Sequence, residues 1–198
     1  SANTDNVTIK NLFVEVNGSA VPALTFTNSS IEIIDSQIEG VETDATCNIS
    51  LFNCKIIFNS SSQGVTLLGE NISVKNCEFG YTGGSNWTGV VQLGSVATKA
   101  TTESVIYNDN DSNGGRFEFT TGISTNTISN NTFNGLARIS GTSTQYIIII
   151  NGGSNSVISN NNLRGVDSSS IAQTTYYVNF VGVGEVVRQL NMSYNNFI

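Results

Sequence analysis

Apolar and polar residues alternate along this chain in short runs, and these runs recur in one form. The form reads apolar, any, apolar, any, Asn or Asp, any, any, apolar. Its second apolar position falls at residues 9, 33, 51, 74, 106, 128, 158 and 192, so successive copies begin 18 to 34 residues apart. Alternation is typical of a β-strand with one buried face, and nothing recurs at helical spacing. A period in the twenties, stretched by insertions, predicts a solenoid.

A second apolar run and a turn precede most copies of the pattern. Such runs are Ala23 to Phe26, Val65 to Leu68 and Tyr146 to Ile150. Each unit is therefore predicted to contain a strand, a tight turn, a second strand, an Asn-marked bend and a variable loop. Coiling stacks each strand about 4.8 Å from its equivalent in the previous turn, in parallel. The predicted fold class is all-β, a single-stranded parallel β-helix of about eight rungs that forms one domain over residues 1–198.

Asn or Asp occupies one register position in seven of the eight copies. These residues are Asn11, Asp35, Asn53, Asn76, Asn108, Asn130 and Asn160, and Tyr194 takes the position in the last copy. A side-chain amide is both donor and acceptor, so stacked asparagines can bond to the rungs on either side. Asparagine also tolerates the left-handed backbone of a sharp bend. We predict a structural ladder here rather than a ligand site.

The recurring segments, such as Ile128-Ser129-Asn130-Asn131-Thr132-Phe133, resemble those of the right-handed parallel β-helix (pectin-lyase-like) superfamily. The resemblance covers essentially the whole chain, from Asn6 to Phe197, and is closest in style to phage tailspikes and surface adhesins. It implies a right-handed coil. The superfamily includes pectin-degrading enzymes, phage tailspikes, bacterial and archaeal adhesins and periplasmic accessory proteins. Fold alone does not choose among these functions.

The composition narrows the classes of partner. Only 12% of the residues are charged, the net charge is −7, and Asn, Ser and Thr make up over a third of the chain. The eight Lys and Arg residues form no cluster. We therefore expect no nucleic-acid partner and no membrane insertion. The pattern is already present at Val7 and still runs at Ile198, and a free-standing solenoid needs end caps, so we expect a segment of a longer protein.

The three cysteines are too few for a disulfide scaffold. Cys54 and Cys77 each follow a ladder asparagine directly, so we expect them in one column on adjacent rungs. A column of small buried residues is the favoured interpretation. Neighbouring rungs lie within disulfide range, so a bridge between Cys54 and Cys77 is the alternative, although stacked side chains point in parallel. Cys47 could compete as a bridging partner. With no His in the chain, a zinc site is not expected.

One segment has the spacing of a calcium loop. Asp109, Asp111 and Asn113, followed by Gly114, match the opening half of D-x-D-x-N-G. The motif requires an acid at its twelfth position, but this chain has Thr120 there, so half of the motif is missing. A plain loop is the favoured interpretation, and calcium is the only cofactor for which the sequence offers ligands.

A glycine-rich insertion carries the aromatic residues that suit sugar recognition. Tyr81, Asn86 and Trp87 fall within this loop, and aromatic rings stack on the C–H faces of sugars while small polar groups bond to hydroxyls. We predict a glycan site there, with an equal alternative in which Trp87 caps apolar strand surface.

Isoleucine on both faces of the 147–150 run also predicts a covered outer face. An insertion loop or a neighbouring subunit of a homotrimer would provide that cover.

Sequence motifs give little support for catalysis. Asn3-Thr4-Asp5 looks like the Asn-Thr-Asp element of polygalacturonases, but that family's paired aspartates, Gly-His-Gly and Arg-Ile-Lys elements have no counterpart, and the pectate-lyase Trp-Ile-Asp-His is also absent. Two carboxylates at suitable separation would suffice for glycoside hydrolysis. Glu32 with Asp35, and Glu42 with Asp44, are the candidate pairs. Such pairs also arise by chance among 15 scattered acids.

Three functional hypotheses follow, in order. The first is a structural, host-glycan-binding segment of a phage tailspike or tail fibre, extracellular on the virion surface and trimeric as the resemblance implies. The second is a bacterial or archaeal cell-surface adhesin or surface-layer-like protein, built as a longer monomeric β-helix. The third is a glycan-degrading hydrolase or lyase. The expected partner of the first two is a host-surface or extracellular polysaccharide.

Overall fold

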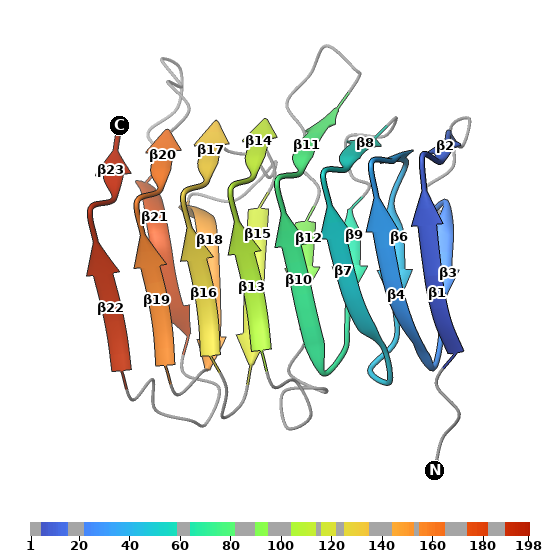
Figure 1. The fold of residues 1–198 in the computed structure, drawn as a ribbon. Coiled ribbons are helices and arrows are strands. Elements are labelled where there is room, and N and C mark those ends of the chain that lie inside the picture. The colour runs from blue at the N-terminus through green and yellow to red at the C-terminus, as the bar shows by residue number, and fades with distance from the viewer. Residues whose placement is uncertain are drawn as a thin grey trace.

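The chain coils into a solenoid of three parallel β-sheets (Figure 1). A computed structural model describes residues 5–15, 22–58, 64–81, 90–94, 104–113, 116–121, 125–134, 144–152, 155–164, 174–181 and 189–198. Within these residues every strand pairs in parallel with its equivalent in the next turn, and no helix occurs. The predicted parallel β-helix solenoid is confirmed.

Successive strands enter the three sheets in rotation. Sheet A contains β1 (Asp5–Lys10), β4 (Ser29–Ile34), β7 (Asn48–Phe52), β10 (Asn71–Lys75), β13 (Ser104–Asn108), β16 (Thr125–Ser129), β19 (Asn155–Ser159) and β22 (Gln189–Ser193). Sheet B contains β2 (Phe13–Val14), β5 (Gln37–Ile38), β8 (Lys55–Phe58), β11 (Glu78–Tyr81), β14 (Asp111–Asn113), β17 (Thr132–Asn134), β20 (Asn162–Arg164) and β23 (Asn196–Phe197). Sheet C contains β3 (Leu24–Phe26), β6 (Val41–Thr43), β9 (Val65–Leu67), β12 (Val90–Leu93), β15 (Arg116–Thr121), β18 (Thr144–Gly152) and β21 (Thr174–Val181). The second apolar runs of the sequence correspond to the strands of sheet C.

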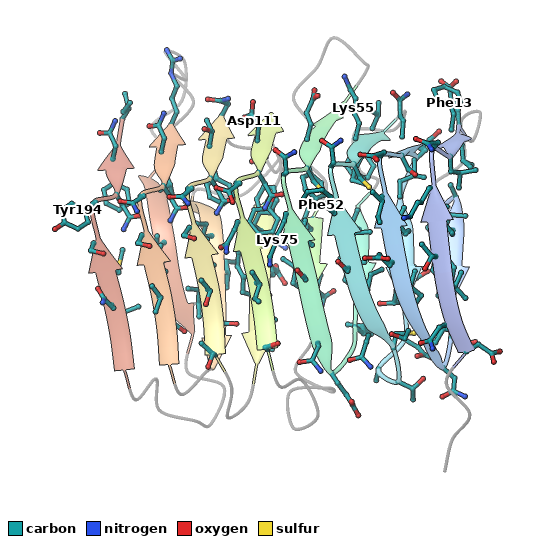
Figure 2. All side chains as sticks on the ribbon, viewed as in Figure 1. Phe13, Phe52, Lys55, Lys75, Asp111 and Tyr194 are labelled. Carbon is teal, nitrogen blue, oxygen red and sulfur yellow. The ribbon has the colours of Figure 1, made fainter. Side chains whose placement is uncertain are left out.

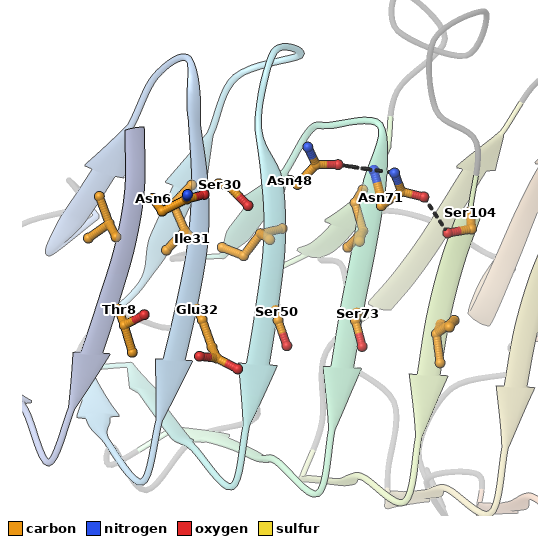
Figure 3. Close-up of a pocket in the computed structure, with 14 residues that line it drawn as sticks. Asn6, Thr8, Ser30, Ile31, Glu32, Asn48, Ser50, Asn71, Ser73 and Ser104 are labelled. Atoms are coloured by element: carbon orange, nitrogen blue, oxygen red, sulfur yellow. Dashed lines mark hydrogen bonds between the residues drawn. The ribbon is translucent and has the colours of Figure 1, made fainter. Parts of the chain in front are cut away.

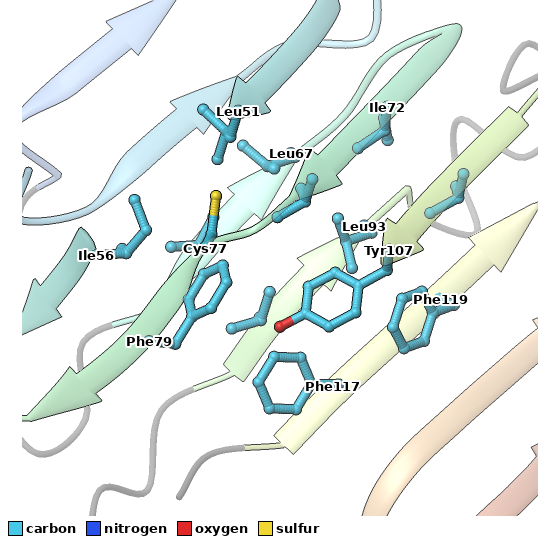
Figure 4. Packing of buried hydrophobic residues seen from close by; sticks show 14 of the residues in the cluster. Leu51, Ile56, Leu67, Ile72, Cys77, Phe79, Leu93, Tyr107, Phe117 and Phe119 are labelled. Atoms are coloured by element: carbon cyan, nitrogen blue, oxygen red, sulfur yellow. The ribbon is translucent and has the colours of Figure 1, made fainter. Parts of the chain in front are cut away.

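Equivalent residues stack in columns because the register is kept from rung to rung. One inward column of sheet A contains Ile33, Leu51, Val74, Tyr107, Ile128 and Ile158, all 0% exposed. Strand alternation turns every second side chain toward this interior. Aromatic rings fill the middle rungs, where the ring centre of Tyr107 lies 5.5 to 6.0 Å from those of Phe79, Phe117 and Phe119 (Figure 4). Phe133 lies 6.0 Å from Tyr107 and 5.0 Å from Phe117. The core is therefore a continuous, mainly apolar rod, into which the buried Asn126 and Ser156 also point.

A single residue with positive φ makes each bend between sheets A and B. These residues are Asn11, Asp35, Asn53, Asn76, Asp109, Asn130, Asn160 and Tyr194, with φ between 50° and 58°. The left-handed backbone expected at the bend is thus observed. Side-chain amides also bond along the column: Asn76 Nδ2 donates to Asn53 Oδ1 at 2.9 Å, and Asn130 Nδ2 donates to Asp109 Oδ1 at 3.1 Å.

The prediction was wrong by one residue in the fifth copy. Asn108 pairs with Lys75 at the end of β13, one residue before the bend, and Asp109 makes the turn. Tyr107 accordingly takes the buried position that the pattern gave to Ile106. Asn108 still contributes to the stack, because its Oδ1 accepts from Ser129 Oγ at 2.8 Å.

A second, buried asparagine ladder follows the bend residues. Its members, each directly after a bend residue, are Asn110, Asn131 and Asn161, which are buried, and Asn195, which is partly exposed. Asn131 Nδ2 donates to Tyr107 O at 2.8 Å and to Asn161 Oδ1 at 2.9 Å. Asn161 Nδ2 bonds in the same way to Ile128 O and Asn195 Oδ1, both at 2.9 Å. These bonds satisfy amides that would otherwise be costly to bury.

The same column holds smaller residues in the earlier rungs. Ser36, Cys54 and Cys77 occupy it, and the two thiols lie in adjacent rungs as predicted. All three cysteines of the chain are buried and unbridged. Ser36 Oγ accepts from Leu12 N at 3.1 Å, which is the role that Asn110 Oδ1 plays for Cys77 N at 2.8 Å.

Candidate functional site

The outer face of sheet A carries a groove across five strands, β1, β4, β7, β10 and β13 (Figure 3). Side chains that alternate with the core residues point outward and form its surface. The floor column is Thr8, Glu32, Ser50, Ser73 and Ile106, and the edge column is Asn6, Ser30, Asn48, Asn71 and Ser104. Most of these side chains are short, which leaves a volume of about 490 Å³. We call this site the sheet A groove.

The edge column of the groove is held by its own hydrogen bonds. Asn71 Nδ2 donates to Asn48 Oδ1 at 3.1 Å, and Ser104 Oγ donates to Asn71 Oδ1 at 2.8 Å (Figure 3). These bonds fix the amides in place. A fixed row of polar groups at the spacing of the strands, about 4.8 Å, presents a repeating surface to a ligand.

The floor of the groove keeps free hydrogen-bonding capacity. Among the described residues, the hydroxyls of Thr8, Ser50 and Ser73 have no partner, so each can donate to and accept from a ligand. Glu32 is the single carboxylate of the lining and no cation lines the groove. The surface therefore suits a neutral, hydroxyl-rich molecule better than an anionic one.

A bulkier column flanks the floor on the side of the bend. Phe52 and Lys75 stand two residues beyond Ser50 and Ser73 on the same outward face. Phe52 is 47% exposed, and Figure 2 shows it on the outer surface beside Lys75. An exposed ring next to small polar groups is the combination that stacks on a sugar while its hydroxyls are hydrogen-bonded.

A second groove follows the bend itself. We call it the bend groove; its lining is Asp35, Ser36, Gln37, Asn53, Cys54, Lys55, Asn76, Cys77, Glu78, Asp109 and Asp111, and its volume is about 510 Å³. Four carboxylates and one lysine give it a negative charge. Lys55 Nζ lies 3.3 Å from Glu78 Oε2, and both side chains are nearly half exposed, so this ion pair contributes little to stability.

Of the two candidate carboxylate pairs, Glu32 and Asp35 are divided between the two grooves, and Glu42 and Asp44 line neither. Glu32 lines the sheet A groove, whereas Asp35 lies in the bend groove and accepts from Asn53 Nδ2 at 2.5 Å. Asp44 Oδ1 accepts from Thr46 N at 2.9 Å and Thr46 Oγ1 at 2.6 Å. Slight burial acts to raise the pKa of Asp44, but these hydrogen bonds outweigh it and hold the pKa below its usual value. Asp44 thus shapes a turn.

The residues predicted to bind calcium fall at the bend groove only in part. Asp109 makes the bend and Asp111 begins β14, and each Oδ1 accepts from an asparagine of the next rung, at 3.1 and 3.3 Å. The side chain of Asn113 lies outside the described residues. Within the part of the chain that the structure describes, no three His, Cys, Asp or Glu side chains converge as a metal site would require. Calcium binding here stays a prediction.

The predicted glycan loop lies mostly outside the described residues. Tyr81 ends β11, where it pairs with Phe58, but its side chain is not among those described; Asn86 and Trp87 lie beyond the strand in the undescribed 82–89 segment. The glycan role of this loop stays a prediction.

Of the apolar 147–150 run, Ile148 and Ile150 point into the core and Ile149 is partly exposed, while the side chain of Ile147 is not described.

Sequence reasoning did not anticipate the sheet A groove. A sequence signal was nevertheless present, because one four-residue pattern recurs: Asn, an apolar residue, Ser or Thr, and a second apolar residue. This order begins at Asn6, Asn48 and Asn71, and it places an amide and a hydroxyl on the outer face of three strands. A repeated outward pair of this kind identifies a polar surface once the rungs are known to align.

Comparison with known proteins leaves the family open. No protein-family model, no curated protein and no solved structure gives a significant match to the chain. The described residues also include no helix long and apolar enough to cross a membrane. The arguments for function therefore rest on the surface of the coil.

Proposed function

We propose that this chain is an extracellular β-helix segment of the phage tailspike or tail-fibre type, which provides a rigid shaft and binds a host-surface glycan. The sheet A groove carries the proposal. Its five strands, about 4.8 Å apart, span roughly 19 Å, which suits an extended chain of several sugar rings. Neutral hydroxyls and amides line its length, and Phe52 adds an exposed ring at its side.

The low charge of the groove supports a neutral polysaccharide as the ligand. A single carboxylate, Glu32, lies in the lining, so the site lacks the pair of acids that glycoside hydrolysis uses. This favours binding over cleavage. A groove of fixed polar groups also loses little conformational entropy when a ligand binds, which favours recognition by the scaffold itself.

A screen of bacterial lipopolysaccharides and capsular polysaccharides immobilised on an array tests the proposal. The wild-type protein is expected to retain at least one of them, and Ser50→Trp or Ser73→Trp is expected to weaken that binding at least tenfold by filling the groove. Thr127→Trp is the matched control, since Thr127 continues the floor column beyond Ile106 but does not line the groove. Retention of no glycan, or equal binding by Ser73→Trp and Thr127→Trp, would contradict the proposal.

The alternative assignment is a bacterial or archaeal cell-surface adhesin with the same groove. The two assignments differ in assembly, because the resemblance to tailspikes implies a homotrimer and an adhesin would be a monomeric coil. Native mass measurement on the intact protein separates them. A monomer that still binds glycan through the groove favours the adhesin and removes the trimer.

A further inference from the structure

The proposed glycan site leaves the paired thiols of Cys54 and Cys77 without a role. Both side chains belong to the column that follows the bend and are 3% and 2% exposed. Their rungs are joined on both sides of the pair, by the Phe52 to Lys75 pairing in sheet A and the Lys55 to Glu78 pairing in sheet B. The two cysteines therefore occupy equivalent positions in adjacent rungs.

The surroundings of the pair hold the thiols in place. Cys54 Sγ lies 3.4 Å from Ile33 O and 3.3 Å from Phe52 O, and Cys77 Sγ lies 3.3 Å from Lys75 O. Figure 4 shows Cys77 among the buried apolar side chains. The pair is thus a fixed arrangement of two soft ligands at the boundary of the apolar core.

The bend groove gives this pair a route to solvent and a favourable charge. Cys54 and Cys77 contribute to its lining, which also holds four carboxylates against one lysine. A negative groove raises the local concentration of cations. The groove thus brings cations to the column that holds the two cysteines.

The spacing of the rungs favours a bridging ion over a disulfide. Two metal–sulfur bonds of about 2.3 Å in line span about 4.6 Å, close to the strand separation of about 4.8 Å. A disulfide requires the sulfurs to approach to about 2.05 Å with a dihedral near 90°, which parallel stacked side chains oppose. Soft thiolate ligands also select soft cations such as Cu⁺.

We propose that Cys54 and Cys77 form a binding site for one soft, two-coordinate cation of the Cu⁺ and Hg²⁺ class. With Hg²⁺ as the probe, two S–H bonds break, two S–Hg bonds form and two protons are released to solvent. The mercury product carries no net charge, which the apolar surroundings favour. With Cu⁺ the product is equally neutral when one thiol loses its proton and the other binds as the protonated thiol.

Titration of the reduced whole protein with Hg²⁺, in a buffer that contains a millimolar monothiol, tests the site. We expect one ion per chain to resist the monothiol, with thiolate-to-metal absorption in the ultraviolet. Cys47→Ser is the matched control, because Cys47 is buried elsewhere, 3.3 Å from Asp44 Oδ1, and its loss should leave the resistant ion in place. Cys54→Ser and Cys77→Ser should each lose it.

A measurement on the wild-type protein guards against a folding defect in the variants. X-ray absorption at the mercury edge, on the folded protein with one equivalent of Hg²⁺ in thiol-free buffer, should show two sulfur neighbours of the ion. A single sulfur neighbour would show binding by one cysteine and would overturn the proposal. Retention of the resistant ion by Cys54→Ser, or its loss from Cys47→Ser, would do the same.

Discussion

Asn131 Oδ1 accepts two hydrogen bonds from Asn110, one from the backbone N at 2.9 Å and one from Nδ2 at 3.1 Å. The next rung repeats this arrangement, in which Asn161 Oδ1 accepts from Asn131 N at 3.0 Å and Asn131 Nδ2 at 2.9 Å. One side chain thus satisfies the backbone and the side chain of its neighbour at once. The buried ladder joins consecutive rungs where the backbone leaves sheet A.

Asn131→Ala should lower the free energy of unfolding by about 3 kcal/mol, because it leaves buried polar groups of Asn110 and the carbonyl of Tyr107 without partners. Denaturation in guanidinium chloride measures the change. Asn196→Ala is the control: its exposed amide makes only a 3.4 Å bond to Asn162, so we expect a change within about 0.5 kcal/mol. Equal effects of the two substitutions would show that burial of the ladder adds nothing.

Exchanging the residues of two bends should shift stability in opposite directions. Tyr194 and Asn160 both have positive φ, 56° and 55°, but tyrosine pays a steric cost there that asparagine largely avoids. Tyr194→Asn should therefore raise the free energy of unfolding by roughly 1 kcal/mol, and Asn160→Tyr should lower it by about 1 to 2 kcal/mol. The midpoint of thermal unfolding reports both changes. Shifts of the same sign in both variants would argue against the backbone as the cause.

Tyr107→Phe should stabilise the protein. The hydroxyl of Tyr107 is fully buried and has no hydrogen-bond partner among the described residues, so its removal should raise the free energy of unfolding by on the order of 1 kcal/mol. Ring packing against Phe79, Phe117 and Phe133 would be kept.

The same substitution should change the response to alkaline pH. Burial, with smaller contributions from Cys77 and Asp111, raises the pKa of Tyr107 well above its usual value near 10. A pKa raised in the folded state gives a contribution that is complete below the unfolded pKa and is lost as pH rises above it. The advantage of Tyr107→Phe should therefore widen above about pH 10. Tyr194→Phe, on a ring 88% exposed, is the control, and a similar widening there would contradict the explanation.

Gly69→Ala should destabilise the turn that leads into β10. A Cβ at Gly69 would collide with the carbonyl oxygen of Cys47, which already accepts from Glu70 N at 3.0 Å. Relief of this clash requires backbone movement, and we expect a loss of about 2 kcal/mol. At Gly80 the nearest atom to an added Cβ would be Ile57 Cδ1 at 3.6 Å, an ordinary contact, so Gly80→Ala should be nearly neutral. Circular dichroism during thermal unfolding compares the two.

The strands and their stacking could be predicted from the sequence, because alternation and the recurring bend residue carry both signals. The run Asn108-Asp109-Asn110 shows the limit. Three consecutive residues each suit a bend, so only the pairing of Asn108 with Lys75 fixes which one turns the chain. A pattern that accepts any apolar residue could not distinguish the partly exposed, outward-facing Ile106 from the buried Tyr107.

The grooves were harder to predict than the strands. Asparagine is usually exposed, so nothing local marks Asn131 as buried and Asn130 as exposed. The sheet A groove depends on short outward side chains in five consecutive rungs, from Thr8 to Ile106. Taken alone, each of these residues looks like an ordinary outward position of a strand. They form one surface only because the register aligns the five strands.

The number of residues in each turn varies along this coil. Equivalent residues are separated by 18 positions between Asp35 and Asn53 and by 34 between Asn161 and Asn195, yet both pairs meet side chain to side chain. Added loop length of this kind costs little free energy. Segments can therefore be inserted or deleted one turn at a time while the cross-section of the shaft remains unchanged.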